Sequence, residues 1–287
     1  MMRMQTSISD DAGLLDLFER LALEAGRRIL EVRNRGSATE TKADSSPVTE
    51  ADRAAEAVIL AGLREALPGM GCVAEEEVAA GIVCDTSGGA FILVDPLDGT
   101  REFIGGKPDF TVNIALVRGG VPLIGTVYAP ARGELFSGRP GLATFATVMP
   151  DFSIGDRREI AVRGLAGRPT VVASRSHRTP ETDAFIENLG EAEICSIGSS
   201  LKFGLLARGE ADFYPRLGRT MEWDTAAGDA VLRAAGGQTL TLDGKPLRYG
   251  KRNQADDADF ANPWFVACGR AGQRLRGILN GQRQQKV

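Results

Sequence analysis

The stretch AFILVDPLDGTREF, residues 90–103, constrains the fold more than any other part of the chain. Its apolar first half predicts a buried strand. The strand ends in a segment that carries two carboxylates, Asp95 and Asp98. Pro96 restricts φ and Gly99 permits a positive φ, so we predict a rigid turn at the C-terminal end of the strand. Two carboxylates held this close repel each other, and the pattern therefore predicts a positive charge between them.

The expected ligands at this turn are oxygen atoms only. Asp95 and Asp98 can point to one place, with the Leu97 carbonyl between them. Such a set suits a hard cation, Mg²⁺ or Ca²⁺. If a helical turn begins at Gly99 and Thr100, its free N–H groups would face the same place and could hold a phosphate. The alternative is a purely structural turn in which Asp98 caps the following segment.

Two further acidic segments are candidates for the same site. Glu75, Glu76 and Glu77 follow a short predicted strand, although a run of like charges is usually a solvated start to a loop. Asp224 stands in EWDTAAG, where it would cap the alanine-rich helix that follows. The neighbouring Trp223 indicates a packed setting instead.

Asp44 and Asp52 flank a segment in which Pro47 ends one element and Thr49 starts a helix. Thr49 is the expected N-cap, with Asp52 at the capping-box position three residues later. Taken one at a time, the acidic residues of all these segments are more typical of structural roles than of catalysis.

The composition limits what the chain can bind. Its 287 residues are 43% hydrophobic and 25% charged, which is typical of a globular protein with a core, and the net charge is −4. No broad basic field would attract the backbone of a nucleic-acid polymer. A small anionic ligand stays compatible with the sequence, because a bound cation can reverse the local field.

The sequence predicts a cytoplasmic location. The N-terminal stretch lacks the apolar core and cleavage site of a signal peptide, and no apolar run reaches the ~20 residues that span a bilayer. The four cysteines, Cys72, Cys84, Cys195 and Cys268, form no CxxC pair, so we expect buried thiols in a reducing compartment. Peripheral association with the inner membrane is an alternative, and both a monomer and a homodimer stay open.

Other catalytic motifs are absent or misplaced. The segment 69–74 fits GxGxxA, but it precedes a predicted strand, whereas a dinucleotide-binding turn follows one. There is no GxxxxGK[ST] motif, and the single histidine, His177, excludes a histidine-rich zinc site. A Ser-His-Asp triad would have to use His177, and no GxSxG elbow supports it. His177 is therefore an ordinary loop residue or a ligand contact.

The predicted elements change character along the chain. The first part has helices followed by a meander of strands, which is typical of an α+β unit; its elements are 14–33, 49–67, 72–74, 90–94, 110–118, 122–128 and 134–137. The second part alternates strands and helices, which is typical of an α/β unit; its elements are 170–174, 180–189, a strand near 194, 199–208, 211–214, 224–235, 238–242, 264–267 and 270–279. Residues 138–168 are rich in Gly, Pro and Arg and indicate a boundary. We therefore divide the chain into a metal-binding domain, 1–164, and a substrate-binding domain, 165–287.

Three segments in one order resemble a known superfamily: Glu75-Glu76, then DPLDGT at 95–100, then WDTAAG at 223–228. They are similar to the Mg²⁺-dependent, lithium-inhibited phosphatases that include inositol monophosphatase and fructose-1,6-bisphosphatase. Further stretches resemble the CysQ-type 3'(2'),5'-bisphosphate nucleotidases: KADSSPVT at 42–49, VDPLDGTREF at 94–103, DFTVNIALV at 109–117, SRSH at 174–177, IGSSLKF at 197–203 and ADFYPR at 211–216. The resemblance covers roughly residues 26–265.

The chain also departs from that branch. Arg101 stands where the branch often has lysine, and Arg219 where it often has proline. Residues 138–163 are longer and less similar, so the resemblance predicts little about them.

The resemblance implies a layered αβαβα sandwich of two packed subdomains and a site with two or three Mg²⁺ ions. The ligands it implies are Glu75, Asp95 and the Leu97 carbonyl for one metal, Asp95, Asp98 and Asp224 for a second, and Asp44 or Glu76 for a third.

The implied reaction is hydrolysis of a phosphate ester by metal-activated water. Thr100, paired with Asp52, would orient the water with help from Glu75, and the amides of Gly99 and Thr100 would hold the phosphate. The candidate substrate contacts are Gly198, Ser199, Ser200, Lys202, Arg175, His177, Arg216 and Asp224. The expected substrate is 3'-phosphoadenosine 5'-phosphate, a by-product of sulfate assimilation that would be cleaved to AMP and phosphate. Phosphoadenylyl sulfate is a second expected substrate.

Two alternatives remain. One is an inositol or sugar monophosphatase. The other, from a different class, is a non-catalytic sensor that binds metal and nucleotide. The joint presence of acidic ligands and the water-orienting pair Asp52 and Thr100 argues against the sensor, which needs no such pair.

Overall fold

Two β-sheets organise the chain. A computed structural model describes residues 10–36, 39–41, 47–82, 84–165, 167–174, 179–270, 275 and 277. The larger sheet has seven strands in the order β3-β4-β5-β6-β7-β8-β9, and the smaller has five in the order β11-β10-β12-β14-β13. A separate ribbon pairs β1 (Thr39–Thr41) with β2 (Pro47–Thr49).

The larger sheet is a meander with one parallel edge. Its strands are β3 (Gly71–Ala74), β4 (Ala90–Asp98), β5 (Thr111–Arg118), β6 (Val121–Ala129), β7 (Glu134–Arg139), β8 (Leu142–Val148) and β9 (Ile154–Glu159). β3 runs parallel to β4, and every later pair is antiparallel. β4 is therefore an inner strand, and its end lies inside the molecule.

Both faces of the larger sheet are covered, which explains the unbroken apolar run in β4. Ile92 and Val94 pack in one core with helices α1 (Asp11–Arg35) and α2 (Glu50–Ala66). Phe91 and Leu93 point the other way, into the core shared with α6 (Leu201–Ala207) and α7 (Ala226–Ala234). A strand buried on both faces needs apolar residues at consecutive positions rather than at alternate ones.

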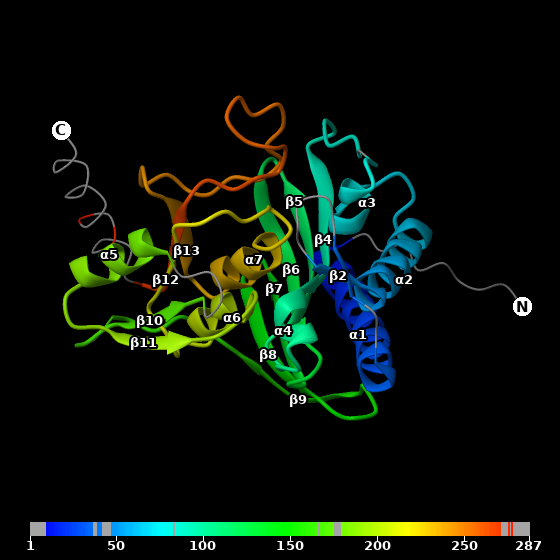
Figure 1. Cartoon of the computed structure of the whole chain (residues 1–287), viewed down its shortest axis with the longest axis horizontal. Coiled ribbons are helices and arrows are strands. Elements are labelled where there is room, and N and C mark those ends of the chain that lie inside the picture. The colour runs from blue at the N-terminus through cyan, green and yellow to red at the C-terminus, as the bar shows by residue number, and fades with distance from the viewer. Residues whose placement is uncertain are drawn as a thin grey trace, which may run out of the picture.

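The smaller sheet completes the layers. Its strands are β10 (Thr170–Ala173), β11 (Glu193–Ser196), β12 (Phe213–Arg216), β13 (Gln238–Thr241) and β14 (Phe265–Cys268). α5 (Pro180–Asn188) packs on its outer face through Phe185 and Ile186. Figure 1 shows the succession from α5 through the smaller sheet, α6 and α7, the larger sheet, and finally α1 with α2. The predicted αβαβα sandwich is confirmed.

A pair of glycines lets α7 approach the larger sheet closely. Gly125 on β6 and Gly138 on β7 are register partners. A Cβ atom on Gly125 would lie 2.4 Å from the carbonyl oxygen of Ala227, and one on Gly138 would lie 2.7 Å from Cα of Val231. The helix backbone therefore rests almost directly on the sheet. This contact sets the position of the helix that begins just after Asp224.

The helix starts follow the predicted capping chemistry. Asp10 caps α1 by accepting a hydrogen bond from the Gly13 amide at 2.8 Å. At α2, Thr49 accepts from the Ala51 amide, and Asp52 accepts from the Thr49 amide at 2.8 Å, so the predicted capping box is confirmed. In the described part of the chain, no helix combines the length and the apolar character needed to cross a membrane.

The structure corrects the prediction for residues 138–168, for which no strand was expected. β8 and β9 lie there and extend the larger sheet. β9 is an exposed edge strand that is rich in charged residues. It therefore lacks the alternation of apolar and polar residues by which a strand is recognised in a sequence. The division at 164/165 remains a prediction. The predicted helix over 270–279 lies mostly outside the described residues; Leu275 and Gly277 are helical.

One long-range ion pair ties the edge strand to α1, and we expect it to contribute measurably to stability. Arg157 donates to both carboxylate oxygens of Glu19, at 2.8 and 2.7 Å, and the Glu19 side chain is 6% exposed. Arg157→Met leaves this buried carboxylate without its partner. We expect the free energy of unfolding in urea to fall by about 1–3 kcal/mol.

The matched control is Arg27→Met, which removes an exposed pair with Glu24 at 3.9 Å. Its loss should stay below about 1 kcal/mol. Equal losses for Arg157→Met and Arg27→Met would contradict the importance of the buried pair.

Candidate active site

The end of β4 is bent by a bulge and a left-handed glycine. The register of β4 with β5 shifts between Asp95 and Asp98. Gly99 follows with φ 94°, and α4 (Thr100–Ile104) begins immediately after it. A Cβ atom on Gly99 would lie 3.1 Å from the Asp109 carbonyl oxygen. Glycine is therefore required here both by backbone conformation and by space.

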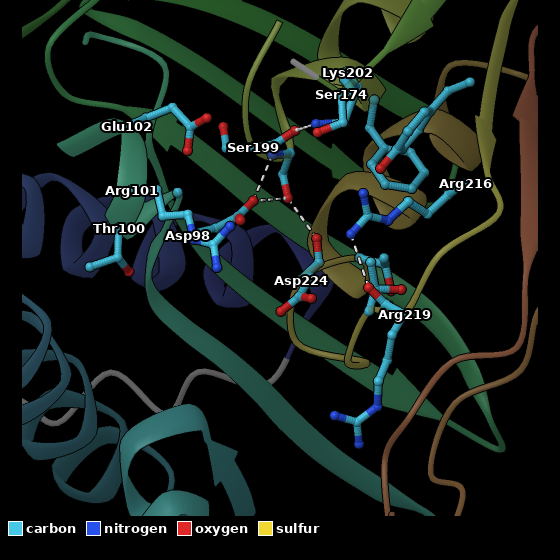
Figure 2. A pocket seen from close by; sticks show the side chains of 16 residues that line it. Asp98, Thr100, Arg101, Glu102, Ser174, Ser199, Lys202, Arg216, Arg219 and Asp224 are labelled. Atoms are coloured by element: carbon cyan, nitrogen blue, oxygen red, sulfur yellow. Dashed lines mark hydrogen bonds between the residues drawn. The ribbon is translucent and has the colours of Figure 1, made fainter. Parts of the chain in front are cut away.

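Asp98 is connected to the second half of the chain through Ser200. The Ser200 amide donates to Asp98 Oδ2 at 2.6 Å, and the Ser200 hydroxyl lies 2.9 Å from the same oxygen. That hydroxyl also lies 2.6 Å from the Asp224 carbonyl. The predicted metal ligands Asp98 and Asp224 are thus brought together by one serine (Figure 2). The alternative in which Asp98 caps its own following segment is wrong, because its partner lies 102 residues away.

Asp224 does not cap α7 either. The cap position is Thr225, which makes no side-chain capping bond. Asp224 Oδ2 instead accepts from the Met221 amide at 2.9 Å, three residues earlier. The carboxylate is therefore held by its own loop and lines the cavity described below.

The surroundings of Asp98 and Asp224 disfavour the ionised form of each carboxylate. Burial raises the pKa of Asp98 above its usual range, although the nearby Lys202 partly offsets this. Burial also raises the pKa of Asp224, and the negative charges of Asp98 and Glu75 add to the effect. A carboxylate whose pKa is raised by neighbouring negative charges, as that of Asp224 is, is electrostatically suited to a cation.

The donor set fits Mg²⁺ in chemistry, but the ligands are not yet gathered around one point. Among the described residues, no three acidic, histidine or cysteine side chains form a ready-made cation site. Each aspartate accepts a backbone hydrogen bond: Asp95 from the Leu97 amide at 3.1 Å, Asp98 from the Ser200 amide, and Asp224 from the Met221 amide. Asp44 lies outside the described residues.

The predicted pair of Asp52 and Thr100 meets across the chain. The Thr100 hydroxyl lies 3.2 Å from Asp52 Oδ1 and 3.2 Å from the Leu97 carbonyl oxygen. The other oxygen of Asp52 accepts from the amide and the hydroxyl of Thr49, at 2.8 and 2.7 Å. The capping box of α2 thus holds the Asp52 carboxylate so that its Oδ1 faces Thr100, at the end of β4. Its chemical role remains a prediction.

The acidic run forms a short helix rather than the start of a loop. Glu75 and Glu76 begin α3 (Glu75–Ala79), directly after β3. The Glu76 amide donates to Glu56 Oε2 at 2.9 Å. Burial raises the pKa of Glu56 to about 7, with help from the charges of the acidic run. Sequence analysis missed Glu56, although its position four residues after Asp52 would have placed both on one face of α2.

One cavity is lined by eight of the seventeen site residues predicted from the sequence. Those of its lining residues that were predicted from the sequence are Asp98, Gly99, Thr100, Ser199, Ser200, Lys202, Arg216 and Asp224. Lining residues not predicted as substrate contacts include Arg101, Glu102, Ser174, Tyr214, Arg219 and Thr220. Gly198 packs behind the cavity, where a Cβ atom would lie 2.8 Å from the Asp109 carbonyl oxygen. Arg175 and His177 lie outside the described residues.

Two cations, Lys202 and Arg216, line the cavity opposite Thr100, and we call this part its basic end. Lys202 Nζ donates to the Ser199 carbonyl at 2.6 Å and lies 5.3 Å from the centre of the Tyr214 ring. Burial lowers the pKa of Lys202 to about 8. Arg216 donates to the Arg219 carbonyl at 2.9 Å, and among the described residues its buried Nε has no hydrogen-bond partner. Figure 2 shows Lys202 and Arg216 on the far side of the cavity from Thr100.

The turn before α6 is held in an unusual backbone conformation. Ser199 has φ 46°, in the left-handed region that side-chain-bearing residues seldom adopt. This conformation brings the Ser200 amide to Asp98 and the Ser199 carbonyl to Lys202. Backbone strain of this kind is often found where a ligand is held.

Comparisons with known proteins agree on one family. A profile described as "Inositol monophosphatase family" matches residues 11–267. The 3'(2'),5'-bisphosphate nucleotidase CysQ of Escherichia coli (strain K12) is 44% identical over 254 residues, which cover 88% of this chain and 98% of that protein. The protein of the same name from Buchnera aphidicola is 37% identical over 256 residues, 88% of this chain and 93% of that protein.

Solved structures give the same result. The crystal structure of CysQ from Bacteroides thetaiotaomicron, a bacterial member of the inositol monophosphatase family, superposes with a TM-score of 0.72 at 36% identity and covers 90% of this chain and 97% of that chain. The structure of inositol monophosphatase from Anabaena (Nostoc) sp. PCC 7120 has a TM-score of 0.70 at 26% identity and covers 94% of this chain and 96% of that chain.

Proposed function

The chain belongs to the inositol monophosphatase family, and we propose that it is a Mg²⁺-dependent 3'(2'),5'-bisphosphate nucleotidase. The proposed reaction is the hydrolysis of 3'-phosphoadenosine 5'-phosphate to AMP and phosphate, with phosphoadenylyl sulfate as a second substrate. The observation that carries the proposal is one cavity that is lined both by the carboxylates Asp98 and Asp224 and by the cations Lys202 and Arg216. A substrate with a single phosphate would offer Lys202 and Arg216 no second phosphate to bind.

Bound Mg²⁺ would neutralise the scissile phosphate and lower the pKa of a water molecule. We propose that the residues holding the ions are Glu75, Asp95, Leu97 through its carbonyl, Asp98 and Asp224, with Asp44 or Glu76 assisting a third ion. The carboxylates fit this role because the pKa values of Asp98 and Asp224 are both raised, and the charges of Asp98 and Glu75 contribute to the shift of Asp224.

The chain's own groups would orient the reactants. The Thr100 hydroxyl can donate to Asp52, 3.2 Å away, so its lone pairs are free to accept a hydrogen from the attacking water. Asp52 is fixed by Thr49, which keeps this pair aligned. The amides of Gly99 and Thr100, at the start of α4, would hold the scissile phosphate.

The basic end would hold the rest of the nucleotide. Lys202 and Arg216 are suited to the second phosphate, because each places a cation on the cavity wall. Ser199 and Ser200 line the wall between the two ends and can contact the sugar. The identity of the chain to the CysQ nucleotidases over nearly their whole length supports this assignment over an inositol phosphate.

Metal removal tests the proposal. We expect phosphate release from 3'-phosphoadenosine 5'-phosphate in the presence of Mg²⁺, loss of release in EDTA, recovery when Mg²⁺ is restored in excess, and inhibition by Li⁺. Release that persists in EDTA would show that the cation assignment is wrong. Nucleotide binding without release of phosphate from any ester would favour the non-catalytic sensor.

A further inference from the structure

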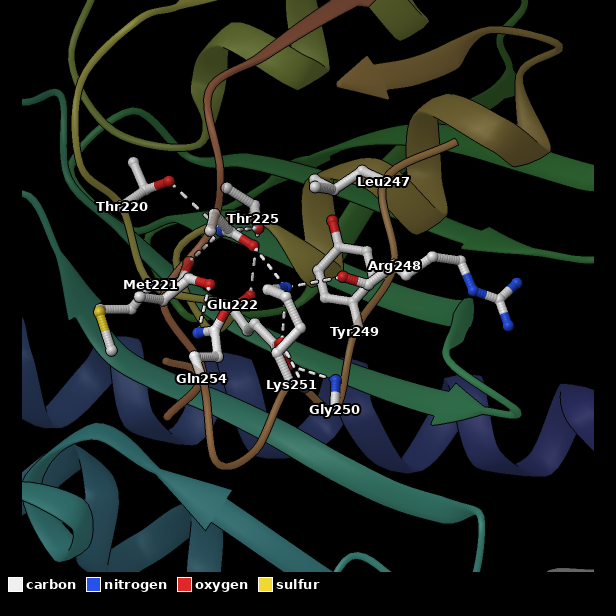
Figure 3. A network of polar contacts seen from close by, with 12 residues as sticks. Thr220, Met221, Glu222, Thr225, Leu247, Arg248, Tyr249, Gly250, Lys251 and Gln254 are labelled. Carbon is white, nitrogen blue, oxygen red and sulfur yellow. Dashed lines mark hydrogen bonds and ion pairs between the residues drawn. The ribbon is translucent and has the colours of Figure 1, made fainter. Parts of the chain in front are cut away.

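The loop that carries Asp224 is held in place by a distant segment of the chain. The site loop, residues 220–225, precedes α7, and the strap, residues 248–262, lies between β13 and β14. Glu222 in the site loop is fully buried, at 0% exposure. Its Oε2 accepts from the Gly250 amide at 2.6 Å, and its Oε1 accepts from the Lys251 amide at 2.9 Å. The strap therefore wraps around a carboxylate two residues away from Asp224 (Figure 3).

Lys251 supplies the charge that balances this buried carboxylate. Its Nζ lies 2.6 Å from Glu222 Oε1, 2.7 Å from the Arg248 carbonyl and 3.1 Å from Asn262 Oδ1. The three contacts match the three N–H donors of an ammonium group. Lys251 does not line the cavity, so it does not contact substrate there.

Asn262 carries the connection from Lys251 back to the site loop. Its side-chain nitrogen lies 2.8 Å from the Met221 carbonyl, 3.0 Å from the Thr225 hydroxyl and 3.3 Å from the Thr220 hydroxyl. Thr220 and Thr225 both line the cavity. The side chain thus spans the two ends of the site loop.

The main chain reinforces this arrangement. The Glu222 amide donates to the Phe260 carbonyl and the Asn262 amide donates to the Thr220 carbonyl, both at 2.8 Å. Trp223 packs against the Phe260 ring, with 6.4 Å between ring centres. Met221, whose amide holds the Asp224 carboxylate at 2.9 Å, forms an isolated bridge with Ala261 of the strap.

We propose that Lys251 is a positioning residue for Asp224. The ion pair with Glu222 and the bond to Asn262 hold the strap on the site loop, and the site loop holds the Asp224 carboxylate. The proposal rests on the proposed function, in which Asp224 is a Mg²⁺ ligand. Without Lys251, Glu222 is a buried carboxylate with no compensating cation, a situation that is strongly unfavourable. The expected response is movement of Glu222 toward water and loss of the fixed loop.

The test compares Mg²⁺ affinity by calorimetry in Lys251→Met, Glu222→Gln and the double variant, well below each melting temperature. Lys251→Met should bind Mg²⁺ about 10–100-fold more weakly, as is typical when a group that orients a metal ligand is removed. Glu222→Gln removes the fully buried charge and leaves Lys251, whose side chain is 20% exposed, so it is the safer variant for folding; it should also bind Mg²⁺ more weakly. The double variant should bind no more weakly than Lys251→Met, because both changes break one pair.

Two further readouts separate positioning from a general loss of structure. In a Trp264→Phe background, Trp223 is the remaining one of the two tryptophans, and acrylamide quenching of its fluorescence should rise in Lys251→Met. In phosphate release from 3'-phosphoadenosine 5'-phosphate, Lys251→Met should require more Mg²⁺ and approach the wild-type kcat at saturating Mg²⁺. The matched control is Lys245→Met, which removes a lysine from an exposed pair with Asp243 at 2.8 Å and should change none of these values.

The proposal would be overturned if Lys251→Met and Glu222→Gln had lower melting temperatures but wild-type Mg²⁺ affinity. It would also be overturned if the losses of Mg²⁺ binding free energy in the two single variants simply added in the double variant. The outcome for the proposed function is separate. A wild-type protein that binds Mg²⁺ but releases no phosphate contradicts the proposed function alone, while the affinities still decide the role of Lys251. A wild-type protein that binds no Mg²⁺ contradicts both.

Discussion

Asp98→Asn should reduce kcat/KM for 3'-phosphoadenosine 5'-phosphate by about 10²–10⁴-fold. Asp98 contacts the second half of the chain through Ser200, whose hydroxyl lies within hydrogen-bond distance of both the Asp98 carboxylate and the Asp224 carbonyl. Asparagine keeps the shape but removes one of the charges that would hold Mg²⁺. Metal stabilisation of the transition state amounts to several kcal/mol, and each 1.36 kcal/mol is a tenfold change in rate, which gives about the range stated. Steady-state phosphate release at fixed Mg²⁺ measures the effect.

The same substitution should not destabilise the metal-free protein. Burial and the neighbouring Glu102 disfavour the charged form of Asp98, so a neutral side chain relieves an unfavourable charge. The matched control is Asp212→Asn, at a carboxylate that is 3% exposed and pairs with Arg163 at 2.7 Å, outside the cavity. That variant should lose stability and keep its activity. An Asp98→Asn protein with nearly wild-type turnover would contradict the metal role.

Gly125→Ala should be the most damaging single-methyl change in the core. The new Cβ would lie 2.4 Å from the Ala227 carbonyl oxygen, 2.8 Å from Cβ of Ala230 and 2.9 Å from Cα of Ala227. These atoms belong to α7, and a backbone cannot turn aside as a flexible side chain can. Overpacking in a core usually costs about 1–3 kcal/mol, and we expect the upper part of that range or more. Urea denaturation measures the loss.

Because α7 begins two residues after Asp224, the displaced helix should also weaken Mg²⁺ binding. The matched control is Gly88→Ala, in an exposed turn where a Cβ would meet nothing within 4 Å. It should leave both stability and Mg²⁺ affinity unchanged. Similar behaviour of the two variants would contradict the close approach of α7 to the larger sheet.

Local chemistry explains what the sequence could predict. The capping box of Thr49 and Asp52 is decided within three residues, and the structure contains it. The apolar run before Asp95 predicts β4, because a strand that is covered on both faces needs apolar side chains at successive positions. The three ordered motifs are also short local patterns, at the start of α3, at the end of β4 and at the start of α7, and the resemblance that they carry implied the fold.

The remaining features depend on contacts between distant residues, which local patterns do not contain. β9 is recognisable as a strand only through its pairing with β8, since its own residues are exposed. The partner of Asp98 is Ser200, and the partner of Glu222 is Lys251, 29 residues further along the chain. In the sequence, Glu222 is simply a charged residue beside Trp223, and nothing there shows that it is fully buried.

Substrate preference tests the central claim most directly. Wild-type protein at saturating Mg²⁺ should be given 3'-phosphoadenosine 5'-phosphate and inositol 1-phosphate separately, with kcat/KM measured for each and the nucleotide product identified by chromatography. We expect a preference for the nucleotide of at least about 10²-fold, because the smaller ester has no second phosphate for Lys202 and Arg216 to bind. The product should be AMP. Preference for inositol 1-phosphate, or release of the 5'-phosphate to give adenosine 3'-phosphate, would contradict the account.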